Sequence, residues 1–458
     1  MELGFETIGN ATTIVHDRGP VLVTDPWLDG TAYFGSWALQ HEIPSEQREN
    51  ALACEYVWFS HGHPDHLNPE SLPLLRGKKI LLPDHVGGRI RRELEGQGFS
   101  VTVLRDRRWY RLSDRVEIQS LADCNQDAIG LIRVGNALVI DTNDAQDFGR
   151  ARHCRALAAR HRLSFLLSIS GWGDADMSNF YDENGTFVGT PTLTSREPIG
   201  ERNARKAEKF GAKYFVPFSS FHRYHRTDSA WGNRYLAGLS DYATGFSSRS
   251  CEALPAFIRY NLAASRVEEI RPRELAFAPQ APENFGDRWS DPLEKEDQEP
   301  LEKYFRSFEH LTRFLDFVRI RCGGTEHLIQ LGGGFDRGVT FEAPRASLMT
   351  SVKYSIFDDM LIGNFMKTTI HGAWTPAHLY PDFTPYVTKY GDNGNARTEA
   401  EVAAYFREYE RRSMAFRLHR LRPKVMSFVM ETLPKGSLPY RLARGIYRRL
   451  GKRCGLTL

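Results

Sequence analysis

Short runs of apolar and β-branched residues recur through the first 240 positions, separated by turn residues and by stretches with helical spacing. The strand candidates are "TTIVHD", "PVLVTDPW", "YVWFS", "KILLPD", "VTVL", "VEIQSLAD", "IGLIRVG", "ALVIDTND", "LSFLLSIS" and "KYFVPF". The helix candidates are "GGRIRRELEGQG", "HCRALAARH" and "GERNARKAEKFGA". Strands first, followed by strands mixed with helices, predict an α/β fold in which two sheets form a sandwich with helices outside.

The pattern changes after residue 280. Residues 281–302 are rich in proline and acid and lack apolar periodicity, which predicts a linker or a long surface loop between a domain at 1–280 and an α+β extension at 303–410. The extension begins with apolar residues at helical spacing: Phe305, Phe308, Leu311, Leu315 and Val318. Residues 411–458 form a basic tail with the pattern of a short amphipathic helix.

Charge is distributed unevenly along the 458 residues. The last 48 positions hold 13 Lys/Arg against a single acid, Glu431, although the net charge of the chain is only +3. Two interpretations of this basic tail stay open: a solvated helix packed on the body, or a contact with an anionic membrane surface. There is no signal peptide and no apolar run of bilayer length, and the six cysteines are scattered, so we expect a cytoplasmic protein that at most touches a membrane.

The segment "WFSHGHPDHLNPESL" carries the strongest chemical signal. His61 and His63 come directly after an apolar strand, and because they are two residues apart their side chains should point the same way. Pro64 and a helix capped by Asn68 then turn the chain back. Imidazole and carboxylate are ligands for Zn, Fe and Mn, so two metal ions can be held: one by His61 and His63, the other by Asp65 and His66. A polar loop whose histidines only make hydrogen bonds is the weaker interpretation.

The H-x-H-x-D-H spacing of these residues resembles the signature of the metallo-β-lactamase superfamily, which implies its αββα sandwich. A narrower resemblance, to the CMP-N-acetylneuraminate hydroxylases, covers about residues 20–240 and 350–385. It rests on four segments: "DPWLDGTAYFGSWALQHEIPS", "SHGHPDHLNPESL", "YFVPFSSFHRYHRTD" and "FDDMLIGNF". Those hydroxylases carry a Rieske iron–sulfur domain, and no C-x-H…C-x-x-H pair occurs here, so the resemblance implies that electrons come from a separate partner protein.

The superfamily resemblance also implies the remaining ligands. Its bridging aspartate matches Asp144, with Asp141 as the rival, and its last histidine matches His225, with His222 as the rival. Asp228 could orient that imidazole. The superfamily's third histidine has no counterpart between Ser100 and Ala151, and Asp123 lies at about its place.

These residues predict a metalloenzyme with no nucleic-acid partner. The predicted metal ligands are His61, His63, Asp65, His66, Asp123, Asp144 and His225, with Asp65 and Asp144 as catalytic residues. A carboxylate in place of a histidine suits iron or manganese better than zinc, and we expect two metal ions, with iron favoured and zinc or manganese as the other choices. The resemblance to the hydroxylases implies an oxygenase that acts on a nucleotide sugar, a glycan or a related polar substrate. The alternative is a hydrolase of a phosphodiester, lactone or ester that uses a metal-activated water.

Overall fold

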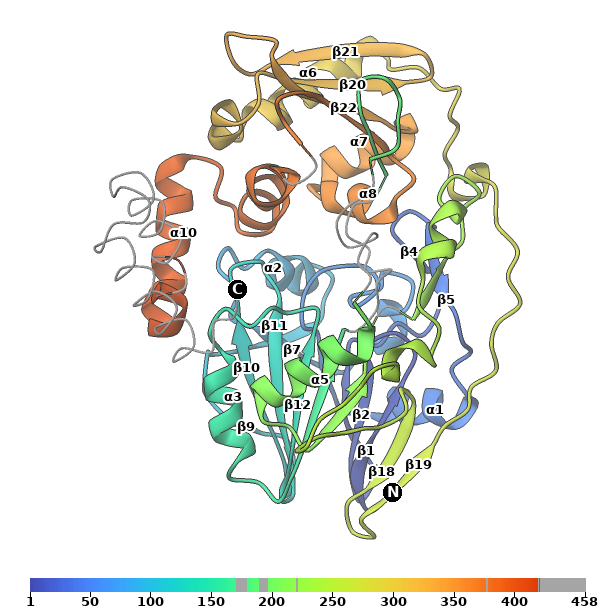
Figure 1. Ribbon diagram of the computed structural model, residues 1–458, viewed down its shortest axis with the longest axis vertical. Helices are drawn as coiled ribbons and strands as arrows, with labels where there is room; N and C mark the ends of the chain where they lie inside the picture. Colours follow the sequence, from blue (N-terminus) through green and yellow to red (C-terminus); the bar gives the residue numbers. More distant parts are fainter. Residues whose placement is uncertain (170–178, 189–196, 220, 376–377, 419, 421–458) are drawn as a thin grey trace.

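The computed structural model describes residues 1–169, 179–188, 197–219, 221–375, 378–418 and 420 (Figure 1). It has two lobes: a sandwich of two large sheets in the lower part of Figure 1 and a smaller lobe of a sheet and helices above it. The upper lobe comes mainly from the C-terminal part of the chain.

The first sheet has eight strands, and the antiparallel strands β1, β2 and β3 lead into the parallel series β3, β6, β7 and β8. Its order is β19 (Arg266–Glu269), β18 (Ile258–Asn261), β1 (Leu3–Ile8), β2 (Thr12–Asp17), β3 (Pro20–Thr24), β6 (Tyr56–Trp58), β7 (Lys79–Pro83) and β8 (Ser100–Leu104). Parallel neighbours end at the same edge of a sheet, so the loops after β3, β6 and β7 meet there. The histidine motif follows β6 directly.

The second sheet has seven strands, antiparallel from β9 to β12 and parallel from β12 to β17. Its order is β17 (Glu252–Ala253), β15 (Tyr214–Pro217), β13 (Leu163–Ser168), β12 (Ala137–Asn143), β11 (Ala128–Val134), β10 (Val116–Ala122) and β9 (Tyr110–Arg111). Because β11 and β12 are antiparallel, the residue before β11 lies near the residue after β12. Those residues are Asp127 and Asp144.

Both faces of each large sheet are buried: the inner faces pack against each other, and the outer faces pack against helices. One core cluster between the sheets joins Phe5 and Val15 of the first sheet to Ile132 and Phe165 of the second. Helices α1 (Ser45–Ala53) and α2 (Arg89–Gly96) pack on the outer face of the first sheet. Helices α3 (Ala151–Ala158) and α5 (Ile199–Phe210) pack on the outer face of the second sheet. This is the helix–sheet–sheet–helix sandwich that the strand and helix pattern predicted.

The upper lobe packs around its own core. Its five-stranded sheet has the order β14 (Phe180–Tyr181), β23 (Lys367–Gly372), β22 (Arg337–Glu342), β20 (Phe317–Cys322) and β21 (Thr325–Gln330). The helices in that core are α6 (Lys295–Arg306), α7 (Arg345–Tyr354), α8 (Phe357–Gly363) and a π-helix at Pro385–Asn393. Strand β14 comes from the first part of the chain, so the two lobes are not separated by a single boundary. Helix α10 (Glu399–Arg412) packs through Tyr405 and Tyr409 on Cys124 of the sandwich.

Three local predictions differ from the structure. The predicted linker 281–302 contains the start of α6, because Glu294 and Asp297 form a capping box that initiates a helix despite Pro300. The helical spacing of 305–318 is interrupted, since β20 begins at Phe317 where the sequence alternates. The helix expected after Asn68 is a turn followed by a 3₁₀ helix at Leu72–Leu75, although Asn68 Oδ1 does accept from the backbone N–H of Glu70 and Ser71.

Most of the basic tail, 411–458, lies outside the described residues, so its predicted helix and membrane contact stay predictions. Among the helices that the structure describes, none is both long enough and apolar enough to cross a bilayer.

Candidate metal centre

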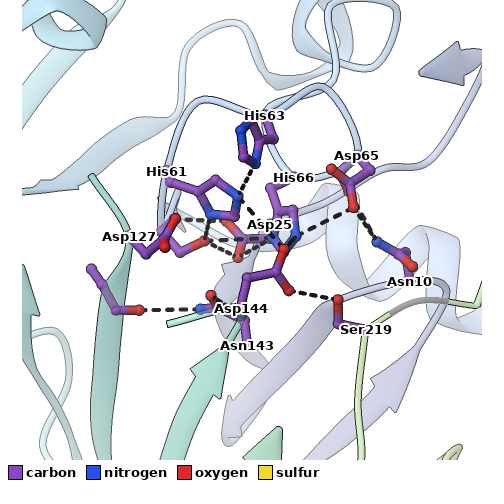
Figure 2. Close-up of polar contacts among 12 residues, drawn as sticks. Asn10, Asp25, His61, His63, Asp65, His66, Asp127, Asn143, Asp144 and Ser219 are labelled. Carbon is purple, nitrogen blue, oxygen red and sulfur yellow. Dashed lines mark hydrogen bonds and ion pairs between the residues drawn. The ribbon is translucent and has the colours of Figure 1, made fainter. Parts of the chain in front are cut away.

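The histidine motif converges on one point at the edge of the sandwich (Figure 2). His61 Nε2 lies 2.9 Å from His63 Nδ1, and Asp65 Oδ2 lies 3.4 Å from His66 Nε2. Asp144, which follows β12, reaches both pairs: its Oδ2 is 3.3 Å from His66 Nε2 and 3.8 Å from His61 Nε2. Two groups of three ligand atoms, each group within 4.8 Å, therefore share Asp144.

The outward ring nitrogens are held by polar partners. Ser60 is the link: its hydroxyl donates to Asp25 Oδ2 at 2.6 Å and lies 2.8 Å from His61 Nδ1, while Asp25 Oδ2 is 3.0 Å from His66 Nδ1. Because the hydroxyl hydrogen goes to Asp25, His61 Nδ1–H donates to Ser60 and leaves its Nε2 lone pair facing His63 Nδ1. If His63 carries its hydrogen on Nε2, its Nδ1 lone pair and that of His61 Nε2 lie 2.9 Å apart, as two nitrogen ligands of one ion can. The arrangement therefore fits a metal ion.

The carboxylates are also fixed. The Tyr33 hydroxyl donates to Asp65 Oδ1 at 2.5 Å, and the Asn10 amide donates to Asp65 Oδ2 at 2.9 Å. The Ser219 hydroxyl donates to Asp144 Oδ1 at 2.8 Å. Burial raises the pKa of Asp65 and of Asp144, but His66 together with other neighbours, His63 and Tyr33 at Asp65 and Ser219 at Asp144, lowers the pKa of both. Both carboxylates are therefore ionised and able to act as ligands.

Near the place of the missing third histidine, Asp123 and Asp127 lie at the two ends of one turn, and burial raises the pKa of both carboxyl groups. Asp123 starts a turn, where its Oδ1 accepts from Asn125 N at 2.8 Å, and burial together with Asp127 raises its pKa well above the usual range. The turn brings Asp127 beside His61 (Figure 2), where Lys389, His63, Asp144 and His66 are its main charged neighbours. Asp123 as a ligand stays a prediction, and Asp127 is a second candidate in the same turn. The antiparallel pairing of β11 with β12 could have indicated Asp127.

His225, the predicted last histidine, lies away from the metal loop. Its ring is half-buried near Phe285, with 6.1 Å between ring centroids, and Asp228 pairs with Arg226 and not with an imidazole. Its rival His222 starts β16 (His222–Tyr224), which pairs with β5 (Trp37–Leu39). The strand pairing buries His222 completely, stacks it on Trp37 at 3.3 Å between ring centroids, and places it in the field of Asp65 and Asp144.

Both ring nitrogens of His222 lack a hydrogen-bond partner within the described part of the chain, and burial lowers its pKa to about 3. A neutral, fully buried imidazole without partners has the chemistry of a metal ligand. Asp141, the rival of Asp144, points into the sandwich beside Asp25, and burial raises its pKa well above the usual range. The structure therefore groups Asp144 with the motif and places His222 in the field of Asp65 and Asp144, so that His222 is a candidate ligand.

A cavity of about 380 Å³ opens beside His61. Its charged lining is three arginines and one carboxylate: Arg89, Arg91, Arg105 and Asp84. Arg89 pairs with Glu93 at 2.7 Å and Arg91 with Glu95 at 2.8 Å, so much of this positive charge is balanced. His85 also lines the cavity and donates from Nε2 to the Ser60 carbonyl at 3.1 Å, and burial lowers its pKa to about 4. The cavity therefore places guanidinium groups next to the candidate metal ligands.

The two facing sheets, the outer helices and the H-x-H-x-D-H loop at the sheet edge define a metallo-β-lactamase fold with a histidine–aspartate group suited to divalent metal. Part of the chain is similar to cytidine monophosphate-N-acetylneuraminic acid hydroxylase of Asterias rubens, with 28% identity over 133 residues, 27% of this chain and 20% of that protein. A human relative, named as an inactive form of this hydroxylase, is 39% identical over 66 residues, 14% of this chain and 13% of its own length. The similarity thus spans about a fifth or less of these relatives.

No family model matches the chain. Among solved structures, Igni18, a metallo hydrolase from Ignicoccus hospitalis, aligns with a TM-score of 0.37 and 14% identity, over 59% of this chain and 99% of that one. The sequence similarity agrees with the hydroxylase resemblance predicted from the sequence, while the activity of the chain is a matter for proposal.

Proposed function

We propose that the protein is a dinuclear metal-dependent oxygenase that hydroxylates an anionic, sugar-like small molecule. The observation that carries the proposal is the carboxylate at the third-histidine position, now Asp127, beside His61 and His63. Three aspartates and four histidines form a mixed oxygen and nitrogen ligand set: Asp65, Asp127, Asp144, His61, His63, His66 and His222. Such a set suits iron better than an imidazole-rich set does. Iron bound there would supply O₂ activation.

The chain's own groups orient these ligands. Ser60 and Asp25 hold the rings of His61 and His66, and Tyr33 holds Asp65, so little reorganisation is needed when metal binds. Full burial of His66 and near-full burial of Asp65 keep bulk water from these atoms. Access is from the side of the 380 Å³ cavity, which reaches His61.

The same cavity supports an anionic substrate. Arg89, Arg91 and Arg105 line the cavity, and although Arg89 and Arg91 pair with Glu93 and Glu95, a guanidinium can also hold a phosphate or carboxylate group of a substrate. A volume of about 380 Å³ lies in the range of small-molecule sites, about 300–1,000 Å³. The partial similarity to proteins named as nucleotide-sugar hydroxylases agrees with this substrate class. A separate redox protein would supply the electrons.

The test is metal analysis and Mössbauer spectroscopy on protein loaded with ⁵⁷Fe, followed by turnover of a nucleotide-sugar panel under ¹⁸O₂ with a chemical reductant. Two irons per chain and ¹⁸O in the product support the oxygenase. Two zinc ions, with phosphodiester or lactone hydrolysis that is unchanged without O₂, support the hydrolase instead, because the same ligands can activate water.

A variant pair tests the observation itself. Asp127→His restores an imidazole and should shift metal preference from iron toward zinc, measured as the Fe:Zn ratio after competitive loading. Asp123→His is the matched control in the same turn and should leave the ratio unchanged. If the two variants behave alike, Asp127 is not a ligand.

A further inference from the structure

The upper lobe reaches the metal loop at His63. Asp358 lies in the first turn of α8, and its Oδ2 is 3.1 Å from His63 Nε2. Lys389, in the π-helix, places its Nζ 3.2 Å from the same nitrogen and 3.7 Å from Asp358 Oδ2. All three side chains are buried, with exposed fractions of 9%, 4% and 8% for His63, Asp358 and Lys389.

These two neighbours of His63 Nε2 demand opposite hydrogen positions. Asp358 accepts only, so it favours the tautomer that carries hydrogen on Nε2 and leaves the Nδ1 lone pair toward His61. Lys389 donates only, so on its own it favours hydrogen on Nδ1, which would block ligation. The Nδ1 atom is the one that faces the metal position, 2.9 Å from His61 Nε2.

We infer that Asp358 is a positioning residue that selects the metal-binding tautomer of His63 and that, by pairing with Lys389, it keeps this ammonium group from acting on the ring. The inference rests on the metal site of the proposed function but not on its oxygen chemistry. It makes the upper lobe part of the metal centre, since α8 lies directly above the sandwich (Figure 1).

Zinc affinity of the full chain, measured by chelator competition, tests this in a double-mutant cycle. Asp358→Ala should weaken binding of one ion by about 10–100-fold, the usual effect of losing a partner that orients a ligand. Lys389→Met should change it by less than about 3-fold, because the His63–Asp358 bond stays. The double variant should bind better than Asp358→Ala alone, because the donor that favours the wrong tautomer is gone.

A purely structural role for the ion pair predicts a different pattern. Equal losses in the two single variants, or a double variant no better than Asp358→Ala, would overturn the inference. Asp297→Ala is the matched control, because it removes a buried carboxylate of the upper lobe that pairs with Arg345 at 2.6 Å, and it should leave zinc affinity unchanged. Melting curves without metal show whether each variant is folded.

A second readout follows the hydrogen itself. In zinc-loaded protein with ¹⁵N-histidine, the His63 Nε2–H should exchange slowly in the wild type and rapidly in Asp358→Ala. Slow exchange in both would contradict the inference. Failure of the proposed function is distinguishable, because wild-type protein that binds two ions without oxygenating any substrate still gives a valid cycle. Wild-type protein that binds no zinc would overturn both.

Discussion

His222 offers a test in which the metal-free and metal-loaded proteins should respond in opposite directions. We consider His222→Phe, which keeps an aromatic ring against Trp37 and removes two buried nitrogens that have no partner within the described residues. Each such nitrogen costs about 2 kcal/mol of stability, so the two together cost about 4 kcal/mol. Fitting the larger phenyl ring into the same space costs about 2 kcal/mol. We therefore expect metal-free His222→Phe to be more stable than wild type by about 2 kcal/mol.

The size of the chain sets the thermal shift. An unfolding entropy of about 2.1 cal/mol/K per residue gives about 1 kcal/mol/K for a 458-residue chain, so the metal-free variant should melt about 2 °C higher. An ion present at about 1,000 times its Kd stabilises the wild type by about 4 kcal/mol. Loss of a ligand that weakens one ion about 100-fold removes about 2.7 kcal/mol of this. The rise in Tm on adding metal should therefore be about 3 °C smaller in His222→Phe than in wild type.

Calorimetric melts with and without a chelator, together with metal content by mass spectrometry, measure both effects. The control is His225→Phe, which changes the other histidine of the same segment and should leave the metal-induced rise intact. A His222→Phe protein that holds two ions and shows the wild-type rise would refute the assignment of His222 as a ligand. A metal-free variant that melts well below wild type would refute the argument from the unpaired nitrogens.

Two other changes have clear expected outcomes. Asp144→Asn should lower metal content from two ions to less than one, because Asp144 Oδ2 serves both groups, whereas Asp141→Asn should keep two. The pKa of Glu6 is raised by burial, but His16 and Arg259 outweigh burial and lower it from 4.5 to about 2. The ionised Glu6 carboxylate therefore stabilises the fold by about 3 kcal/mol, fully above pH 4.5, and this contribution is lost as the pH falls toward 2. Urea unfolding at pH 5 and pH 3 should show this loss in wild type and little of it in Glu6→Gln.

Short-range sequence patterns predicted the sandwich and the residues of the histidine motif. The strand runs and helical stretches of the first 240 residues form the expected sandwich, because alternation and helical spacing report which face of each element is buried. The motif residues His61, His63, Asp65 and His66 lie within six positions, so a strand and a turn suffice to bring them together. In the extension the same reasoning failed where a helix capped by Glu294 overrode a linker-like composition.

The sequence by itself determined the fold class and half of the metal centre, since both depend on short-range spacing. Only the tertiary structure shows that Asp127 lies in the field of His63, His66 and Asp144, and that His222 lies in the field of Asp65 and Asp144. Each placement depends on which way a turn or a short strand faces once it pairs with β12 or β5. Asp358 and Lys389 lie 295 and 326 residues from His63. Their contact with it exists only because the upper lobe packs on the sandwich, and no local pattern encodes that packing.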